Sequence, residues 1–432
     1  MAKKSSNRPK RLTESRVSSS VEELLAAALG RGDERLETGR YIVTFKENAA
    51  GKGIKSLSAR GLRVADSREF RDQAVTLTNV GDAEAVVFPE IGIAVTSGAA
   101  FESRGLSALA DGSTDSAIEA IEPDYFVFPH TDNRDYLRGF VRVAEAIARD
   151  LLTPEDEEVG TEEEALVSGA TWGLIKCKVP PSLRSGAGIK VAVLDGGMDL
   201  GHPDFAGRTF VTQTFVGQPV NDPVGHATHI IGTACGPKAP AGATPRYGIG
   251  YKTLIHLGRV LSNGGGTTAT VLAGVNWAIT NRCPAILLAL GSASPAQAAY
   301  TAAGAAALNK GCLMIAAAGS GGGPTSSPAN SPTIMAVASV DPTLVPSAFS
   351  NVGKIEIAAP GRDVFSSVPR PVKYQTQSGT SQAAAHVAGC AALWAESSPS
   401  LRGLALWKKL QATARHLPFP STRVGAGLVQ AP

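Results

Sequence analysis

Three polar side chains stand out because each lies beside glycine or another small residue at the boundary of an apolar segment. Asp195 ends the run IKVAVLD, His226 lies in GHATHIIGTA, and Ser381 precedes the alanine-rich stretch of SGTSQAAAHVAG. A hydroxyl, an imidazole and a carboxylate that meet can perform nucleophilic acyl transfer, because the imidazole removes the hydroxyl proton and the carboxylate orients the imidazole. This hypothesis requires Asp195, His226 and Ser381 to lie within hydrogen-bond distance of one another.

Each of these residues also has a purely structural interpretation. An aspartate after a strand commonly caps a turn or a helix, and a serine at the start of a helix is a preferred N-cap. His226 and His229 are three residues apart and would share a helix face, as a metal-binding pair does. However, no HExxH motif and no matching Cys/His group lies nearby. We therefore expect one histidine to act as a general base and the other to be its structural neighbour.

The apolar pattern of the C-terminal part predicts the elements that must position these side chains. Continuously apolar runs alternate with stretches of helical composition, as in TATVLAGVNWAI, AILLALG, AAGAAALNKG, CLMIAAAG, TIMAVASV and IEIAAPG. Strands that are apolar on both faces are typical of a parallel sheet covered by helices on both sides. The predicted fold class is therefore α/β, with a doubly wound parallel sheet. In such sheets, functional side chains gather at the carboxyl ends of the strands.

The motifs around the three residues resemble those of the subtilase family of serine peptidases, and the chain order Asp, His, Ser is that of subtilisin. VAVLDGG resembles the family's VAVLDTG and is followed by HPDF, HATHIIG resembles HGTHVAG, and GTSQAAAHVAG resembles GTSMAAPHVAG. SAFSNVG and IAAPG also resemble family signatures. The resemblance extends from about Thr171 to the C-terminus. It implies a subtilisin-like serine endopeptidase in which Ser381 is the nucleophile, His226 the base and Asp195 its partner.

The same resemblance implies how a polypeptide substrate binds. An extended chain would pair as a strand with two segments of the enzyme, Gly264, Gly265, Gly266 and Ala289, Leu290, Gly291. Glycine suits such places because a second backbone must come close.

Several residues beside the expected site depart from the family pattern. The family's AAGN segment supplies an asparagine side chain to the oxyanion hole, and here Ser320 stands at that position. The helix N-terminus at Ser381 is expected to supply backbone N–H groups to the same hole. Ala227 replaces a glycine, Ala385 replaces a proline, and Gln382 stands where methionine is common. These changes leave two alternatives open: a catalytically weak subtilase-fold binding or regulatory protein, and a peptide ligase or macrocyclase.

Residues 39–130 resemble the inhibitory prodomain of subtilases, since YIVTFK and AIEPD match its opening and its ending. Strand patterns at YIVTF, AVTL, AVVF, IGIAV and DYFVFP, with helical spacing at Leu106, Leu109 and Ile118, predict a small α+β unit. The resemblance implies an intramolecular inhibitor and folding aid whose C-terminal tail lies in the active site. We expect a zymogen that cleaves itself between His130 and Thr171. An unrelated accessory domain is the alternative.

Two further segments complete the predicted domain organisation. Residues 1–38 are predicted to be a basic, disordered tail with a short helix at VEELLAAALG. Residues 131–170 are predicted to be a helical segment followed by an acidic linker. The catalytic domain then spans residues 171–432.

Composition excludes several other classes. A charged fraction of 18% and a hydrophobic fraction of 43% exclude wholesale disorder, and a net charge of +3 does not favour nucleic acid as a partner. No apolar run approaches the roughly 18 residues of a membrane span, and no apolar core follows the basic N-terminus as it would in an export signal. Gly196 and Gly197 follow a strand without forming GxGxxG, which argues against a nucleotide-binding Rossmann domain.

The five cysteines are widely spaced and form no CxxC pair, which predicts buried reduced thiols rather than disulfides or a zinc site. We therefore expect an enzyme that requires no cofactor and has no membrane partner. The expected location is the cytoplasm, with export by a non-classical route as the alternative. Calcium is implied by the family resemblance alone. The expected partners are a polypeptide substrate and the chain's own prodomain.

Overall fold

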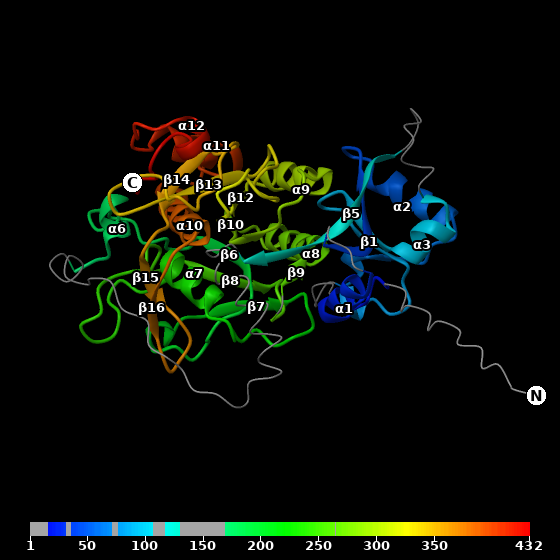
Figure 1. The fold of residues 1–432 in the computed structure, drawn as a ribbon, viewed down its shortest axis with the longest axis horizontal. Coiled ribbons are helices and arrows are strands. Elements are labelled where there is room, and N and C mark those ends of the chain that lie inside the picture. Colours follow the sequence, from blue (N-terminus) through cyan, green and yellow to red (C-terminus); the bar gives the residue numbers. More distant parts are fainter. Residues whose placement is uncertain (1–15, 32–35, 71–76, 107–116, 130–168, 264) are drawn as a thin grey trace, which may run out of the picture.

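The computed structural model describes residues 16–31, 36–70, 77–106, 117–129, 169–263 and 265–432. The segment predicted as helix and acidic linker lies almost wholly outside these ranges, as do the first 15 residues of the predicted tail. Two large sheets organise the rest, one in the N-terminal part and one in the C-terminal part (Figure 1).

The N-terminal sheet has the strand order β5-β1-β4-β3-β2. Its strands are β1 (Glu37–Phe45), β2 (Val64–Asp66), β3 (Ala85–Phe88), β4 (Ile93–Ser97) and β5 (Ile118–Pro129). β1 is antiparallel to both β4 and β5. Helices α2 (Ala50–Ala59) and α3 (Gly98–Ser103) contact its strands, and α1 (Val21–Arg31) contacts β1. The unit is α+β, as the strand patterns predict.

Two local expectations for this unit are wrong. Leu77, expected in a strand, begins a short 3₁₀ helix, Leu77–Asn79. Ile118, expected in a helix, begins β5 and pairs with Phe45 of β1. The pairing places Ile118 in the apolar cluster that contains Phe45, so burial against the sheet outweighs the local helical spacing. In addition, β1 begins at Glu37, inside the segment assigned to the tail.

The C-terminal sheet has seven strands in the order β14-β13-β12-β10-β6-β8-β7, and every neighbouring pair is parallel. The strands are β6 (Lys190–Asp195), β7 (Phe210–Thr214), β8 (Leu254–Arg259), β10 (Ala285–Leu288), β12 (Leu313–Ala317), β13 (Met335–Val340) and β14 (Ile357–Pro360). All residues of β10, β12 and β13 are buried, which explains their continuously apolar sequences. The predicted doubly wound parallel sheet is confirmed.

Helices lie on this sheet in two groups. α7 (His226–Cys235) packs against α10 (Thr380–Ser397), and α8 (Thr268–Thr280) packs against α9 (Ala298–Asn309), with the sheet between the two pairs in Figure 1. Other elements of this part include α6 (Trp172–Lys176), α11 (Gly403–Ala412), α12 (Ser421–Val424) and the hairpin of β15 (Val364–Ser367) and β16 (Tyr374–Gln377). The next strands along the chain, β7 and β8, lie on one side of β6, and all later strands of the sheet lie on its other side. The topological switch point therefore lies between β6 and β10.

β5 extends the N-terminal sheet into the C-terminal part. Beyond its pairing with β1, it runs into the C-terminal part and pairs antiparallel with two short strands there, β9 (Gly266–Thr267) and β11 (Leu290–Gly291). Figure 1 shows β5 extending from the N-terminal unit across to this region.

All five cysteines are buried and free of disulfide bonds, as predicted. Among the described residues, none of the helices has the length and apolar character needed to cross a bilayer.

Candidate active site

Asp195 and His226 meet at the switch point. Asp195 is the last residue of β6, and His226 is the first residue of α7. The Nδ1 atom of His226 lies 3.0 Å from each carboxylate oxygen of Asp195, whose Oδ1 also accepts a 2.7 Å bond from the Gly196 N–H. The two side chains are only 4% and 1% exposed. A carboxylate bound at Nδ1 holds the neutral ring in the tautomer whose Nε2 accepts a proton.

The environment sets the pKa of His226. Burial by itself lowers this pKa, but the charge and hydrogen bond of Asp195 raise it, and the charge of Asp222 adds to them. The net direction is upward from the ordinary value. The imidazolium is therefore stabilised in this site, as a general base requires once it has taken a proton.

Asp222 is a buried carboxylate that the sequence interpretation did not single out. Its Oδ1 accepts hydrogen bonds from the N–H groups of Val224 and Gly225, and its Oδ2 accepts from the N–H and the hydroxyl of Thr228, all at 2.7–3.1 Å. Gly225 occupies the N-cap position of α7 at φ 90°, where glycine has no steric penalty. Asp222 therefore supplies the helix cap that fixes His226. An aspartate shortly before a helix is the sequence signal for this role.

Ser381 is the second residue of α10, which packs against α7. The N-cap interpretation of Ser381 is wrong, because Gly379 holds that position and the helix begins at Thr380. The buried Ser381 Oγ donates a 3.0 Å hydrogen bond to the carbonyl of Ala289. Within the described ranges, Nε2 of His226 has no hydrogen-bond partner. The structure therefore joins His226 to Asp195, but it does not join His226 to the Ser381 hydroxyl.

Ser320 follows β12 and borders the start of α10. Its Oγ accepts a 3.1 Å hydrogen bond from the Thr380 N–H and lies 3.2 Å from the Thr380 hydroxyl. The neighbouring Gly319 N–H donates to that hydroxyl at 3.0 Å. These contacts place Ser320 next to the residue that precedes Ser381, so they also help to fix the helix terminus that carries Ser381.

The segments predicted to bind a substrate hold β5 instead. Gly266 pairs with Val127 on one side, and Leu290 and Gly291 pair with Pro129 and Phe128 on the other. A Cβ atom at Gly265 would lie 2.8 Å from the Phe128 ring and 2.9 Å from the Val127 carbonyl, so this position needs glycine. Gly264 lies outside the described residues. Ala289, the residue before β11, contributes the carbonyl that binds Ser381.

Two carboxylates of β5 itself cap helices of the C-terminal part. Asp124 Oδ1 accepts a 2.9 Å bond from the Ala269 N–H at the start of α8. The Glu122 carboxylate accepts from the N–H groups of Ala298 and Ala299 at the start of α9, at 3.1 and 3.3 Å. Negative charge at a helix N-terminus is stabilising. These contacts attach the N-terminal unit to the helices that flank β9 and β11.

The second histidine of α7, His229, contacts the backbone of the β15–β16 hairpin. Its Nε2 lies 3.0 Å from the Val364 carbonyl and 3.2 Å from the Gln375 carbonyl, and burial lowers its pKa to about 3. A neutral histidine that ties α7 to the β15–β16 hairpin agrees with the predicted neighbour role. In the part of the chain that the structure describes, no three His, Cys, Asp or Glu side chains group as a metal site.

Comparisons with known proteins identify the class of this fold and site. The family model described as "Subtilase family" matches residues 186–427. An alkaline protease of Alkalihalobacillus alcalophilus is 35% identical over 288 residues, covering 64% of this chain and 72% of the relative. Subtilisin Savinase of Lederbergia lenta is 35% identical over 271 residues, covering 60% of this chain and 96% of the relative.

Solved structures agree with these sequence comparisons. The crystal structure of a cold adapted subtilisin-like serine proteinase is 31% identical, with a TM-score of 0.53, and the match covers 61% of this chain and 99% of that one. The chain belongs to the subtilase family. It is a subtilisin-like serine protease, so the family and enzyme class expected from the motifs are confirmed.

Proposed function

We propose that this chain is a serine endopeptidase that hydrolyses peptide bonds through an acyl-enzyme, with Asp195, His226 and Ser381 as its triad. The observation that carries the proposal is the buried 3.0 Å contact between Asp195 and His226, at the start of a helix packed against the helix that bears Ser381. The buried pair orients the imidazole and leaves its Nε2 as the proton acceptor.

In the proposed reaction, the Ser381 hydroxyl turns from the Ala289 carbonyl to His226 Nε2 by a change of side-chain rotamer. Its oxygen attacks the scissile carbonyl while Nε2 takes the proton, and Nε2 then returns that proton to the leaving amine as the C–N bond breaks. Water cleaves the resulting ester by the same route. Asp195 stays ionised and stabilises the imidazolium. The Ser381 N–H and Ser320 are the proposed donors to the oxyanion.

We further propose that the N-terminal unit is an inhibitory prodomain, supported by the position of β5 between β9 and β11. A polypeptide substrate would pair with the same strands, so β5 and a substrate exclude each other. The predicted self-cleavage between His130 and Thr171 falls outside the described residues and remains part of this proposal.

The proposed chemistry needs no cofactor, because side chains supply every proton transfer. Calcium is implied by the family, but among the described residues no cluster of acidic side chains fits it, and no step depends on it. A cytoplasmic location remains a proposal that rests on the five thiols, and fractionation of the source cells would test it.

Labelling with a fluorophosphonate probe, combined with digestion of a denatured-protein library, tests the function. The wild type should be labelled and should generate new peptide termini, and Ser381→Ala should abolish both. Ser378→Ala is the matched control, because this nearby hydroxyl bonds to the Asp363 N–H and has no proposed part in the reaction. Equal labelling of wild type and Ser381→Ala, or labelling of neither, would contradict the triad. Ligated peptides without hydrolysis products would favour a ligase.

A further inference from the structure

Helix α1 lies against the strand that occupies the substrate position. Its residues Val21, Leu24 and Ala28 are buried in one apolar cluster with Phe126 and Phe128 of β5 and with Val216 of the catalytic part. Leu24 is 1% exposed, whereas Leu29 on the same helix is 62% exposed. One face of α1 therefore packs on both halves of the molecule at once.

The start of α1 is fixed by a reciprocal cap. The Ser20 hydroxyl accepts a 3.2 Å bond from the Glu23 N–H, and the Glu23 carboxylate accepts a 3.0 Å bond from the Ser20 N–H. Such a capping box stabilises a short helix and sets the direction in which the chain enters it. The preceding Val17 is buried in the main apolar core of the molecule. We call residues 16–31 the N-terminal clamp.

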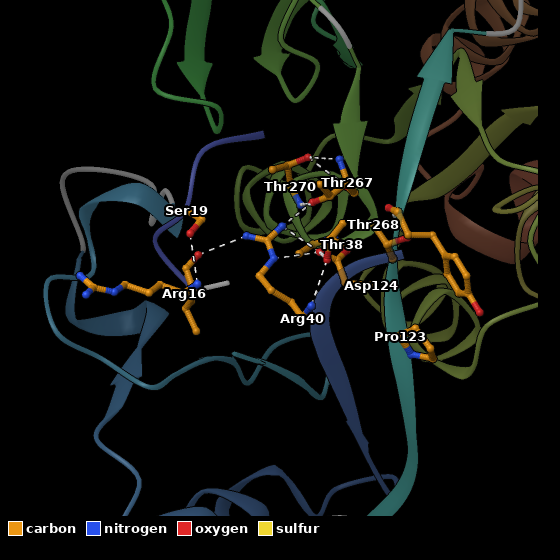
Figure 2. Close-up of polar contacts among 12 residues, drawn as sticks. Arg16, Ser19, Thr38, Arg40, Pro123, Asp124, Thr267, Thr268 and Thr270 are labelled. Atoms are coloured by element: carbon orange, nitrogen blue, oxygen red, sulfur yellow. Dashed lines mark hydrogen bonds and ion pairs between the residues drawn. The ribbon is translucent and has the colours of Figure 1, made fainter. Parts of the chain in front are cut away.

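We call the position between β9 and β11 that β5 occupies the cleft, and a buried arginine connects the clamp to it. Figure 2 shows the Arg40 side chain directed toward Asp124 and Thr267. Its guanidinium donates to the Val17 carbonyl at 3.1 Å, to Asp124 Oδ2 at 2.9 Å and to the Thr267 hydroxyl at 2.8 Å. The clamp, β5 and β9 each contribute one of these acceptors. The planar guanidinium can bond to all three because its donors point in fixed, separate directions.

A second polar contact attaches the clamp directly to the catalytic part. The Gln218 amide donates a 2.9 Å bond to the Glu22 carboxylate, and the Gln218 carbonyl oxygen accepts a 2.7 Å bond from Arg259. Arg259 ends β8, directly opposite Asp195 of β6. The clamp is therefore attached to the catalytic part beside the cleft, and this attachment does not involve the backbone pairing of β5.

We propose that the N-terminal clamp is a second inhibitory element, which docks on the surface formed by Phe126, Phe128 and Val216 and holds β5 in the cleft. This inference rests on the proposed function, since it concerns how that site is kept closed. Two linked attachments release much more slowly than one, because each holds the other at high effective concentration. Opening of the cleft then requires both α1 and β5 to leave.

Hydrogen exchange of the full chain tests the clamp in a Ser381→Ala background, where cleavage plays no part. Leu24→Ala removes the central buried contact of α1, and Leu29→Ala is the matched control on its exposed side. We expect Leu24→Ala to speed exchange of the amides of residues 125–128 by about 10-fold or more, and Leu29→Ala to leave it unchanged. Unchanged exchange in β5, with faster exchange in α1, would overturn the proposal.

Val216→Ala truncates the same contact from the catalytic side and serves as a second variant if Leu24→Ala does not fold. It should also speed exchange in β5, and exchange at the wild-type rate would again overturn the clamp. In the active background, Leu24→Ala should raise the rate of fluorophosphonate labelling by a similar factor. If no variant is labelled, the proposed function fails, whereas the exchange experiment still decides the role of the clamp.

Discussion

The hydroxyl of Ser381 donates a 3.0 Å hydrogen bond to the carbonyl of Ala289, the residue that precedes β11. Gly291 pairs with Phe128 and Leu290 with Pro129, so β5 runs antiparallel to β11 and its C-terminal end points toward Ala289. The last described residues of β5 therefore lie next to the segment whose carbonyl binds the candidate nucleophile. This relationship links the strand that we propose as inhibitory to the site of the proposed chemistry.

The register predicts where processing starts. We expect the first self-cleavage at the bond after residue 130, which leaves Thr131 as the new N-terminus. Intact-mass measurement and N-terminal sequencing of the purified chain check this expectation, with Ser381→Ala as the uncleaved control. A single uncleaved wild-type chain would count against autoprocessing. A first cut further along the segment would contradict the register.

Replacement of Asp222 tests the electrostatics of His226. Asp222→Asn removes a negative charge that raises the pKa of His226. Because His226 must be neutral to act as a base, the acidic limb of the kcat/KM profile should move to lower pH. The rate at the optimum should also fall, by about 10-fold, because an amide N–H₂ cannot accept the bonds from Thr228.

Asp199→Asn is the charge-matched control for that experiment. The Asp199 carboxylate bonds to the Arg370 guanidinium, whose hydrogen bonds hold the pKa of Asp199 at about 2. Its neutralisation should leave the acidic limb in place. If wild type and Asp222→Asn had the same acidic limb in their kcat/KM profiles, Asp222 would have only a structural role, at the start of α7.

Ser320→Asn tests the proposed oxyanion hole. In subtilisin itself, removal of the asparagine donor costs about 10² to 10³ in kcat. If Ser320 donates poorly because its hydroxyl is bonded at Thr380, the asparagine variant should raise kcat by up to that factor, with KM little changed. Steady-state kinetics on a peptide substrate measure this. Ser320→Ala is the comparison variant. Equal kcat values for asparagine, serine and alanine at position 320 would mean that another group donates the hydrogen bond to the oxyanion.

The buried His386 is expected to make the folding stability of the protein decrease in acid. Burial in α10 lowers its pKa from the ordinary 6.5 to about 4, and its Nδ1 lies 2.9 Å from the Gln382 carbonyl. The unfolded chain therefore binds a proton that the folded chain rejects, so stability present above about pH 6.5 is lost as the pH falls toward 4. Urea midpoints between pH 7 and 4 should fall less steeply for His386→Leu. The exposed His416→Leu should show the wild-type slope.

The sequence predicted much of the C-terminal part for a physical reason. Strands of a parallel sheet are buried on both faces, so β10, β12 and β13 carry continuous apolar runs that can be read without a structure. The motifs around Asp195 and His226 then placed two side chains at strand and helix ends that meet. The same approach failed at Ile118, whose strand depends on its pairing with Phe45.

By itself, the amino-acid sequence determined the family, the parallel sheet and the identity of the candidate triad, because those properties depend on local residue types and their order. Only the tertiary structure decided that Asp222 caps the helix of His226, that the Ser381 hydroxyl bonds to Ala289, and that α1 covers Phe126 and Phe128. These contacts join residues distant along the chain or depend on side-chain direction. Neither is encoded in local periodicity, since both arise when packing brings separate elements together.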